Sequence, residues 1–124
     1  MTIPPFLAVA TGGALGALAR WWTARAVIAL SGSEAALGTF AVNVLGSFGL
    51  GLFAAVLLER QSPLALLVLV GFFGAFTTFS TFAMDALRLF EERGLTLAAV
   101  YVFGSVALAL LVFLAGAALG RSFA

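Results

Sequence analysis

The side chains best suited to polar chemistry lie in an unusual place, inside the hydrophobic stretch of residues 71–82. Besides two glycines and five phenylalanines, this stretch contains four hydroxyl residues, interrupted only by a phenylalanine: Thr77, Thr78, Ser80 and Thr81. Ser and Thr hydroxyls can bond to nearby carbonyls and loosen the helical hydrogen-bond ladder. Irregular backbone at membrane depth is tolerated only where protein or water satisfies it. The stretch is therefore either a packing seam between helices or the wall of a path for a polar solute.

A second polar series has helical spacing, with Thr39, Asn43 and Ser47 at steps of four residues. The Asn43 amide would lie within the membrane, where it needs hydrogen-bond partners. A single Asn between helices is often only a hydrogen-bonding clamp, but hydroxyls on the same face favour a polar ribbon. Tyr101 and Ser105 repeat the pattern more weakly, one helical turn apart. Three hydrophobic segments thus each present neutral hydrogen-bond donors.

The chemistry of these side chains indicates what such a path would carry. Hydroxyl and amide groups donate hydrogen bonds to anions, and a phenyl ring presents a positive edge. We expect the acidic residues in or beside turns, with Asp85 near the end of its span. A cation channel or a proton-coupled exporter would normally contain a carboxylate buried in the membrane. The residues therefore favour a small anion or a neutral solute.

One face of the first hydrophobic segment carries small residues at every fourth position, Ala8, Gly12 and Gly16, followed by Arg20. Small residues at this spacing let helices approach closely, so the first three predict a packing seam. Two interpretations of Arg20 remain open. Its side chain is either an anchor that extends toward the membrane surface or a fixed positive charge at the mouth of an anion path.

Composition limits both the class of protein and its chemistry. Of the 124 residues, 64% are hydrophobic and 9% are charged, whereas a soluble domain typically has ~25% charged residues. The absence of cysteine and histidine excludes thiolate and imidazole metal sites and catalysis by these residues. Ser80 has no histidine or lysine to activate it, so we expect no enzyme activity. The net charge of +1 gives nucleic acid nothing to bind.

A transmembrane helix needs ~20 apolar residues, and the sequence predicts an all-α membrane protein with a single domain of residues 1–124. Four spans are expected, at about residues 3–30, 35–58, 63–90 and 95–119. Of five of the six arginines, Arg60 and Arg121 then lie on the side of the termini and three, Arg25, Arg88 and Arg93, on the other, which is too even to set the orientation. Either other features set it, or copies insert both ways. The polar stripes and small-residue seams favour an oligomer.

Three blocks of the sequence resemble the signature blocks of the Fluc/CrcB family of fluoride channels: GGALGALAR at 12–20, GTFAVNVLGS at 38–47 and GFFGAFTTFSTF at 71–82. The third block is highly specific, and the resemblance covers essentially the whole chain. It implies four transmembrane helices, the third broken near its middle, in a dual-topology homodimer of antiparallel subunits. It also implies two pores that export fluoride passively across the plasma or inner membrane of microbial cells, with no organic cofactor.

The resemblance also assigns roles to individual residues. The fluoride path that it implies contains Asn43, Phe79, Phe82, Thr39, Ser80, Thr81, Tyr101 and Ser105. Phe79 and Phe82 would turn their ring edges toward fluoride, and Arg20 would be the vestibule arginine. The backbone carbonyls of Gly74 and Thr77, from both subunits, would hold a structural Na+ on the two-fold axis.

The chain departs from the family pattern at one position of the fourth helix, and two other functions are compatible with a small membrane protein of this size. The family often has a second serine one turn beyond Ser105, where this chain has Ala109, so the polar track on the fourth helix is shortened. A small dual-topology exporter of the multidrug type would need a glutamate in the first helix, and residues 3–19 contain none. A structural subunit of a larger membrane complex would need no polar path at all.

Overall fold

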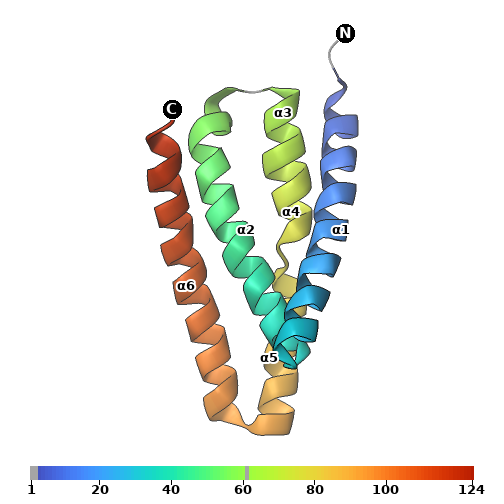
Figure 1. Ribbon diagram of the computed structural model, residues 1–124, viewed down its shortest axis with the longest axis vertical. Coiled ribbons are helices and arrows are strands. Elements are labelled where there is room, and N and C mark those ends of the chain that lie inside the picture. Colours follow the sequence, from blue (N-terminus) through green and yellow to red (C-terminus); the bar gives the residue numbers. More distant parts are fainter. Residues whose placement is uncertain (1–2, 61) are drawn as a thin grey trace.

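The computed structural model describes residues 3–60 and 62–124, and this part of the chain is helical with short connections. Four rods run alternately up and down, and both termini lie at the same end (Figure 1). The third rod is composite, while each of the others is essentially one helix. The elements are α1 (Pro5–Ser31), α2 (Ala35–Leu57) with a 3₁₀ turn η1 (Leu58–Arg60), α3 (Pro63–Ala65), the π-helical η2 (Leu66–Phe72), α4 (Phe73–Phe76), α5 (Phe79–Arg93) and α6 (Leu95–Arg121).

Local signals at the turns explain where the rods begin and end. The third rod begins at Ser62, whose hydroxyl accepts a hydrogen bond from the Ala65 amide at 3.2 Å. Pro63 follows at the first helical position, where a missing amide costs nothing. Gly32 ends α1 and Gly94 separates α5 from α6, with φ angles of 63° and 90°, which residues with a side chain rarely adopt.

Three rods within the described residues are long and apolar enough to cross a membrane: Ala35–Arg60, Pro63–Arg93 and Leu95–Arg121. The helix α1 has 27 residues, about 40 Å at 1.5 Å per residue, but it is not among them. Its glycines, Arg20 and the Trp21–Trp22 pair lower its mean hydropathy. Three of the four predicted spans are thus supported by length and composition, and the first stays a prediction.

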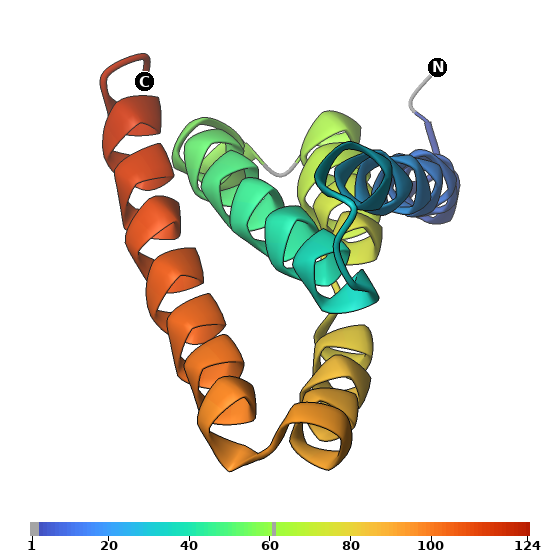
Figure 2. The same ribbon diagram turned by 60° about the horizontal axis from the view of Figure 1, so that its bottom comes forward.

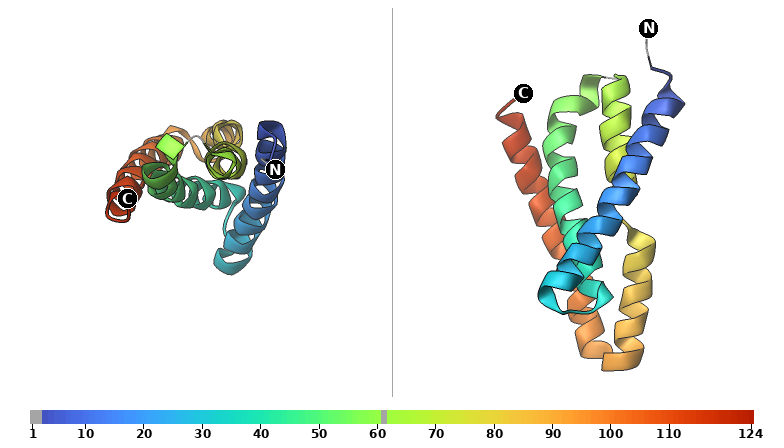
Figure 3. Two further views of the ribbon diagram at one scale, coloured as in Figure 1. Left: turned by 90° about the horizontal axis from the view of Figure 1, so that it is seen from above. Right: turned by 45° about the vertical axis from the view of Figure 1, so that its right-hand side comes forward.

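The face of α1 that carries Ala8, Gly12 and Gly16 is buried, as the spacing predicted. It packs against η2 (Figure 3). A Cβ atom at Gly12 would collide with the Leu67 carbonyl, and one at Gly16 would collide with the Phe72 carbonyl. Backbone therefore meets backbone along this seam, which only glycine permits.

A second glycine seam joins α2 to α6, and Figure 2 shows α2 lying between α6 and α1. Here a Cβ atom at Gly51 would collide with the Phe113 carbonyl, and one at Gly116 with the Phe48 carbonyl. Because α2 and α6 both start at the end opposite the termini, they run parallel. The seam fixes the orientation of α2 and α6 relative to the broken third rod.

Candidate functional site

The third rod is interrupted where the hydroxyl residues cluster. The helix α4 ends at Phe76 and α5 begins at Phe79, and the two residues between them are extended, with ψ of 157° at Thr77 and 120° at Thr78. The Thr78 hydroxyl accepts from the Thr81 amide at 3.2 Å, which is the usual role of a Thr at a helix N-cap. The hydroxyl run thus ends one helix and starts the next, near the middle of the rod.

The Asn43 side chain holds this break from the neighbouring helix α2. Its Nδ2 donates to the Thr78 carbonyl at 2.9 Å, and its Oδ1 accepts from the Thr78 amide at 2.8 Å. In an unbroken helix the Thr78 amide would donate to the Gly74 carbonyl, and the Thr81 amide to the Thr77 carbonyl. Both amides are used elsewhere, so both carbonyls lose their helical donors.

A cavity of about 240 Å³ lies between α2, the break and α6. Four of the predicted pore residues line it together with other side chains: Asn43, Ser47, Leu50, Thr77, Thr78, Phe79, Phe82, Ser105, Val106 and Ala109. The Phe82 ring lies in an aromatic row, with its centroid 5.3 Å from Phe79 and 5.4 Å from Tyr101. The cavity therefore combines phenyl rings with an amide and hydroxyl groups.

Two hydroxyls on α6 have no hydrogen-bond partner among the described residues, although their oxygen atoms are buried. They belong to Tyr101 and Ser105, and the Ser105 side chain is 6% exposed. A buried polar group without a partner costs ~1–3 kcal/mol. A solute that accepts hydrogen bonds would recover this free energy.

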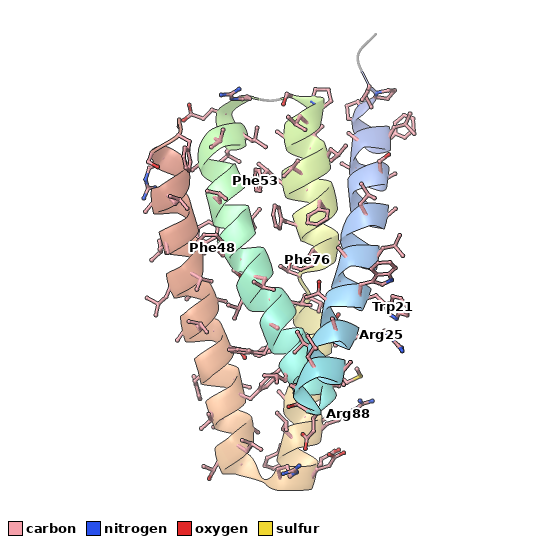
Figure 4. The ribbon with its side chains drawn as sticks, in the orientation of Figure 1. Trp21, Arg25, Phe48, Phe53, Phe76 and Arg88 are labelled. Atoms are coloured by element: carbon pink, nitrogen blue, oxygen red, sulfur yellow. The ribbon has the colours of Figure 1, made fainter. Side chains whose placement is uncertain are left out.

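A second cavity, of about 270 Å³, lies where α1 meets α2 and the start of α5. Arg20 lines it together with Thr39 and Thr81, so three of the predicted residues meet here rather than in the first cavity. Arg25 also lines it and stacks over the Trp21 ring at 5.0 Å from the centroid; Figure 4 shows this pair on the outer side of α1. The cavity is thus positively charged and rich in hydroxyls.

Comparison with known proteins assigns the chain to a family. Residues 7–117 match the family described as CrcB-like protein, Camphor Resistance (CrcB). The chain belongs to the CrcB family. The resemblance noted in the three sequence blocks is therefore confirmed over most of the chain.

Relatives named "Fluoride-specific ion channel FluC" are similar to this CrcB chain over nearly its full length. The Hahella chejuensis protein is 42% identical, with 98% of both chains covered. The Rhizobium leguminosarum protein is 40% identical, covering 95% of this chain and 97% of its own. A longer relative from Methylococcus capsulatus is 44% identical, and this chain spans about half of its length (53%).

One feature of this CrcB protein was not expected. The sequence predicted Asp85 near the end of its span and no deeply placed carboxylate, but Asp85 is only 3% exposed. Its Oδ2 accepts a hydrogen bond from Thr39 Oγ1 at 2.6 Å. Burial by a neighbouring helix is separate from depth in the membrane, so the position of Asp85 near the end of its span stays a prediction. The burial itself depends on which face of α5 meets α2. The Thr39 hydroxyl, which we expected to face an ion, therefore donates its proton to Asp85.

Three of the predicted residues at the break are exposed in this single chain. Phe79 is 78% exposed, and Gly74 and Ser80 are also exposed. A Cβ atom at Gly74 would meet nothing within 4 Å. Tyr101 faces a third cavity, of about 450 Å³, between the α1–α2 turn and the α5–α6 hairpin. The structure therefore brings most of the predicted residues into neighbouring cavities and leaves Gly74, Phe79 and Ser80 exposed.

Proposed function

We propose that this protein is a passive, fluoride-selective channel that exports fluoride across the cell membrane. The observation that carries the proposal is a sequence identity of 40% or more, over nearly the full length of both chains, to relatives named as fluoride-specific ion channels. The donor-rich cavity beside the break supports the same reading. An ion channel needs neither a nucleophile nor a general base, and it is not an enzyme.

The working unit is an antiparallel homodimer with two pores. In each subunit α1 crosses the membrane in addition to the three rods that are long and apolar enough to span it. The exposure of Gly74, Phe79 and Ser80 supports this assembly. A ring in a fluoride path cannot also face lipid, yet Phe79 is 78% exposed in one chain. A second copy that covers the exposed Gly74 and Ser80 would enclose Phe79 as well. The lack of a strong arginine bias between the two ends of the bundle permits both insertions.

Fluoride would move through the first cavity along hydrogen-bond donors and ring edges. Asn43, Phe79, Phe82 and Ser105 line this path, and Tyr101 continues it along α6. Fluoride must lose much of its hydration here, and charge-assisted hydrogen bonds replace it. Positive ring edges add attraction without a fixed charge, so the ion is stabilised and still released. A larger halide would gain less from the same donors.

The second cavity serves as the vestibule. Arg20 supplies a fixed positive charge beside Thr39 and Thr81, with Ser80 exposed one residue from Thr81. A cavity lined by positive charge raises the local concentration of anions. Arg20 is therefore an entry residue rather than a simple membrane anchor.

A structural Na+ would be held by the Gly74 and Thr77 carbonyls of both subunits. The residues fit this role, because the amides of Thr78 and Thr81 donate to Asn43 Oδ1 and Thr78 Oγ1 instead of to these carbonyls. Carbonyls of unwound membrane helices are established ligands for Na+. Two carbonyls from each of two subunits would supply four oxygen ligands. When bound, the cation would supply positive charge near the desolvated anions and join the subunits.

Liposomes that contain the purified protein provide the test. A fluoride electrode should record rapid efflux from fluoride-loaded vesicles, and a chloride electrode should record little efflux from chloride-loaded ones. Protein-free vesicles of the same lipid measure the leak. Equal release of the two anions would contradict selectivity, and fluoride release at the leak rate would contradict the channel itself.

A further inference from the structure

Most hydrogen-bond donors that line the first cavity are already bonded within the protein. The Thr77 hydroxyl donates to the Phe73 carbonyl at 2.9 Å. The Thr78 hydroxyl donates to Thr81 Oγ1 at 3.1 Å, and one amide proton of Asn43 goes to the Thr78 carbonyl. The protons of the break therefore mostly hold the break itself, and few of them remain for an ion.

Ser47 is a polar residue of this cavity that takes no part in holding the break and has no place in the fluoride path described above. It lies one turn beyond Asn43 on α2, lines the cavity and is half-buried. Hydroxyls in helices often bond to the carbonyl four residues earlier, as Thr77 bonds to Phe73. Ser47 makes no such bond among the described residues. Its proton is thus available to the cavity.

The opposite wall of the cavity shows why this proton matters. On α6, Ser105 carries a buried hydroxyl without a partner in the described chain, and the next turn offers only the methyl group of Ala109. Since α2 and α6 run parallel, the step from Asn43 to Ser47 goes in the same direction as the step from Ser105 to Ala109. Ser47 and Ala109 line the same cavity, so beyond Asn43 the helix α2 offers a hydroxyl donor and α6 beyond Ser105 does not.

We infer that the Ser47 hydroxyl donates a hydrogen bond to the permeating anion and continues from α2 the donor track that Ser105 begins on α6. This inference rests on the proposed fluoride path and adds a conducting residue to it. An anion that leaves Ser105 would otherwise meet Val106, Ala109 and Leu50, which cannot replace lost hydration. With Ser47 in place, donors alternate between the two walls.

Fluoride efflux from liposomes tests this inference with a set of variants of the full chain. Ser47→Ala should lower the efflux rate about tenfold, because one hydrogen bond to an ion is lost. Ser47→Thr keeps the hydroxyl and should conduct like the parent. Ala109→Ser in the Ser47→Ala background should restore most of the rate, because it returns a donor from the facing wall. Ser122→Ala, in the exposed turn that follows α6 and outside the described cavities, is the matched control.

The outcomes separate this inference from the proposed function. A parent protein that fails to conduct fluoride contradicts the proposed function. If the parent conducts and Ser47→Ala conducts equally well, the inference is wrong. It is also wrong if Ala109→Ser fails to restore the rate in the Ser47→Ala background, because the loss then reflects a packing defect at position 47 and not a missing donor. A serine on α6 can replace a donor, but it cannot repair packing on α2. Size-exclusion elution of each variant in detergent, unchanged from the parent, would confirm that the fold and assembly are retained.

Discussion

Asn43 and Thr78 lie 35 positions apart in the sequence and are joined by two hydrogen bonds, of 2.9 Å and 2.8 Å. The first runs from the Asn43 amide to the Thr78 carbonyl, and the second runs from the Thr78 amide to Asn43 Oδ1. A side-chain amide thus replaces the helical partners of one residue at the break. The break in the third rod is therefore a bonded structure, held by α2, and not a flexible gap.

Replacing Asn43 should destabilise the break. In Asn43→Leu both backbone groups of Thr78 lose their partners, which should lower the free energy of unfolding by about 2–4 kcal/mol. Asn43→Asp keeps the acceptor for the Thr78 amide but turns a carboxyl oxygen toward the Thr78 carbonyl and places an ionisable group within the membrane, so it should be destabilised as well. Thermal unfolding in detergent measures both variants. An Asn43→Leu protein as stable as the parent would show that the pair does not hold the break.

The sequence indicated part of this arrangement. The hydroxyl run at 77–81 predicted a loosened helix, and the apolar surroundings of Asn43 predicted that its amide needs partners. Neither pattern could identify the partner as the backbone of Thr78, because that contact depends on how α2 packs against the third rod. The burial of Asp85 was missed for the same reason. Helix and turn positions follow from local signals, whereas such contacts follow from glycine seams between rods.

The hydrogen bond between Thr39 and Asp85 predicts a strong coupling between these residues. Thr39→Val leaves a buried carboxylate without its donor, which should cost about 2 kcal/mol or more. In an Asp85→Leu background the same substitution should cost much less, because no charge remains to be satisfied. A double-mutant cycle of unfolding free energies gives the coupling. Additive effects of the two substitutions would contradict the pairing.

The α2–α6 seam predicts different effects for two glycines of the same helix. Gly116→Ala brings a Cβ atom against the Phe48 carbonyl, so the helices must separate and stability should fall by about 1–3 kcal/mol or more. Gly104→Ala meets nothing within 4 Å and should be neutral or slightly stabilising, because alanine favours helix more than glycine does. Thermal unfolding of the two variants compares them directly. Equal losses would mean that the seam is looser than the packing indicates.

Removal of Na+ should weaken the association of subunits if the Gly74 and Thr77 carbonyls bind it. Purification in N-methylglucamine instead of Na+ should lower the unfolding temperature of the proposed dimer, and added Na+ should restore it, because a ligand that binds only the assembled state stabilises it. The amount of dimer is measured by cross-linking in detergent. Identical stability in the two cations would exclude a structural Na+.

Phe82 is the aromatic residue on which the proposed fluoride path should depend most. Its ring is 7% exposed and lies between Phe79 and Tyr101, at 5.3 Å and 5.4 Å. Phe82→Ile keeps an apolar side chain but removes the positive ring edge, so fluoride efflux should fall on the order of tenfold or more. Phe90→Ile makes the same exchange on the same helix at a site that is 51% exposed, and it should conduct normally. An unchanged rate in Phe82→Ile would remove this ring from the mechanism, whereas a loss in both variants would indicate a general effect on the helix α5.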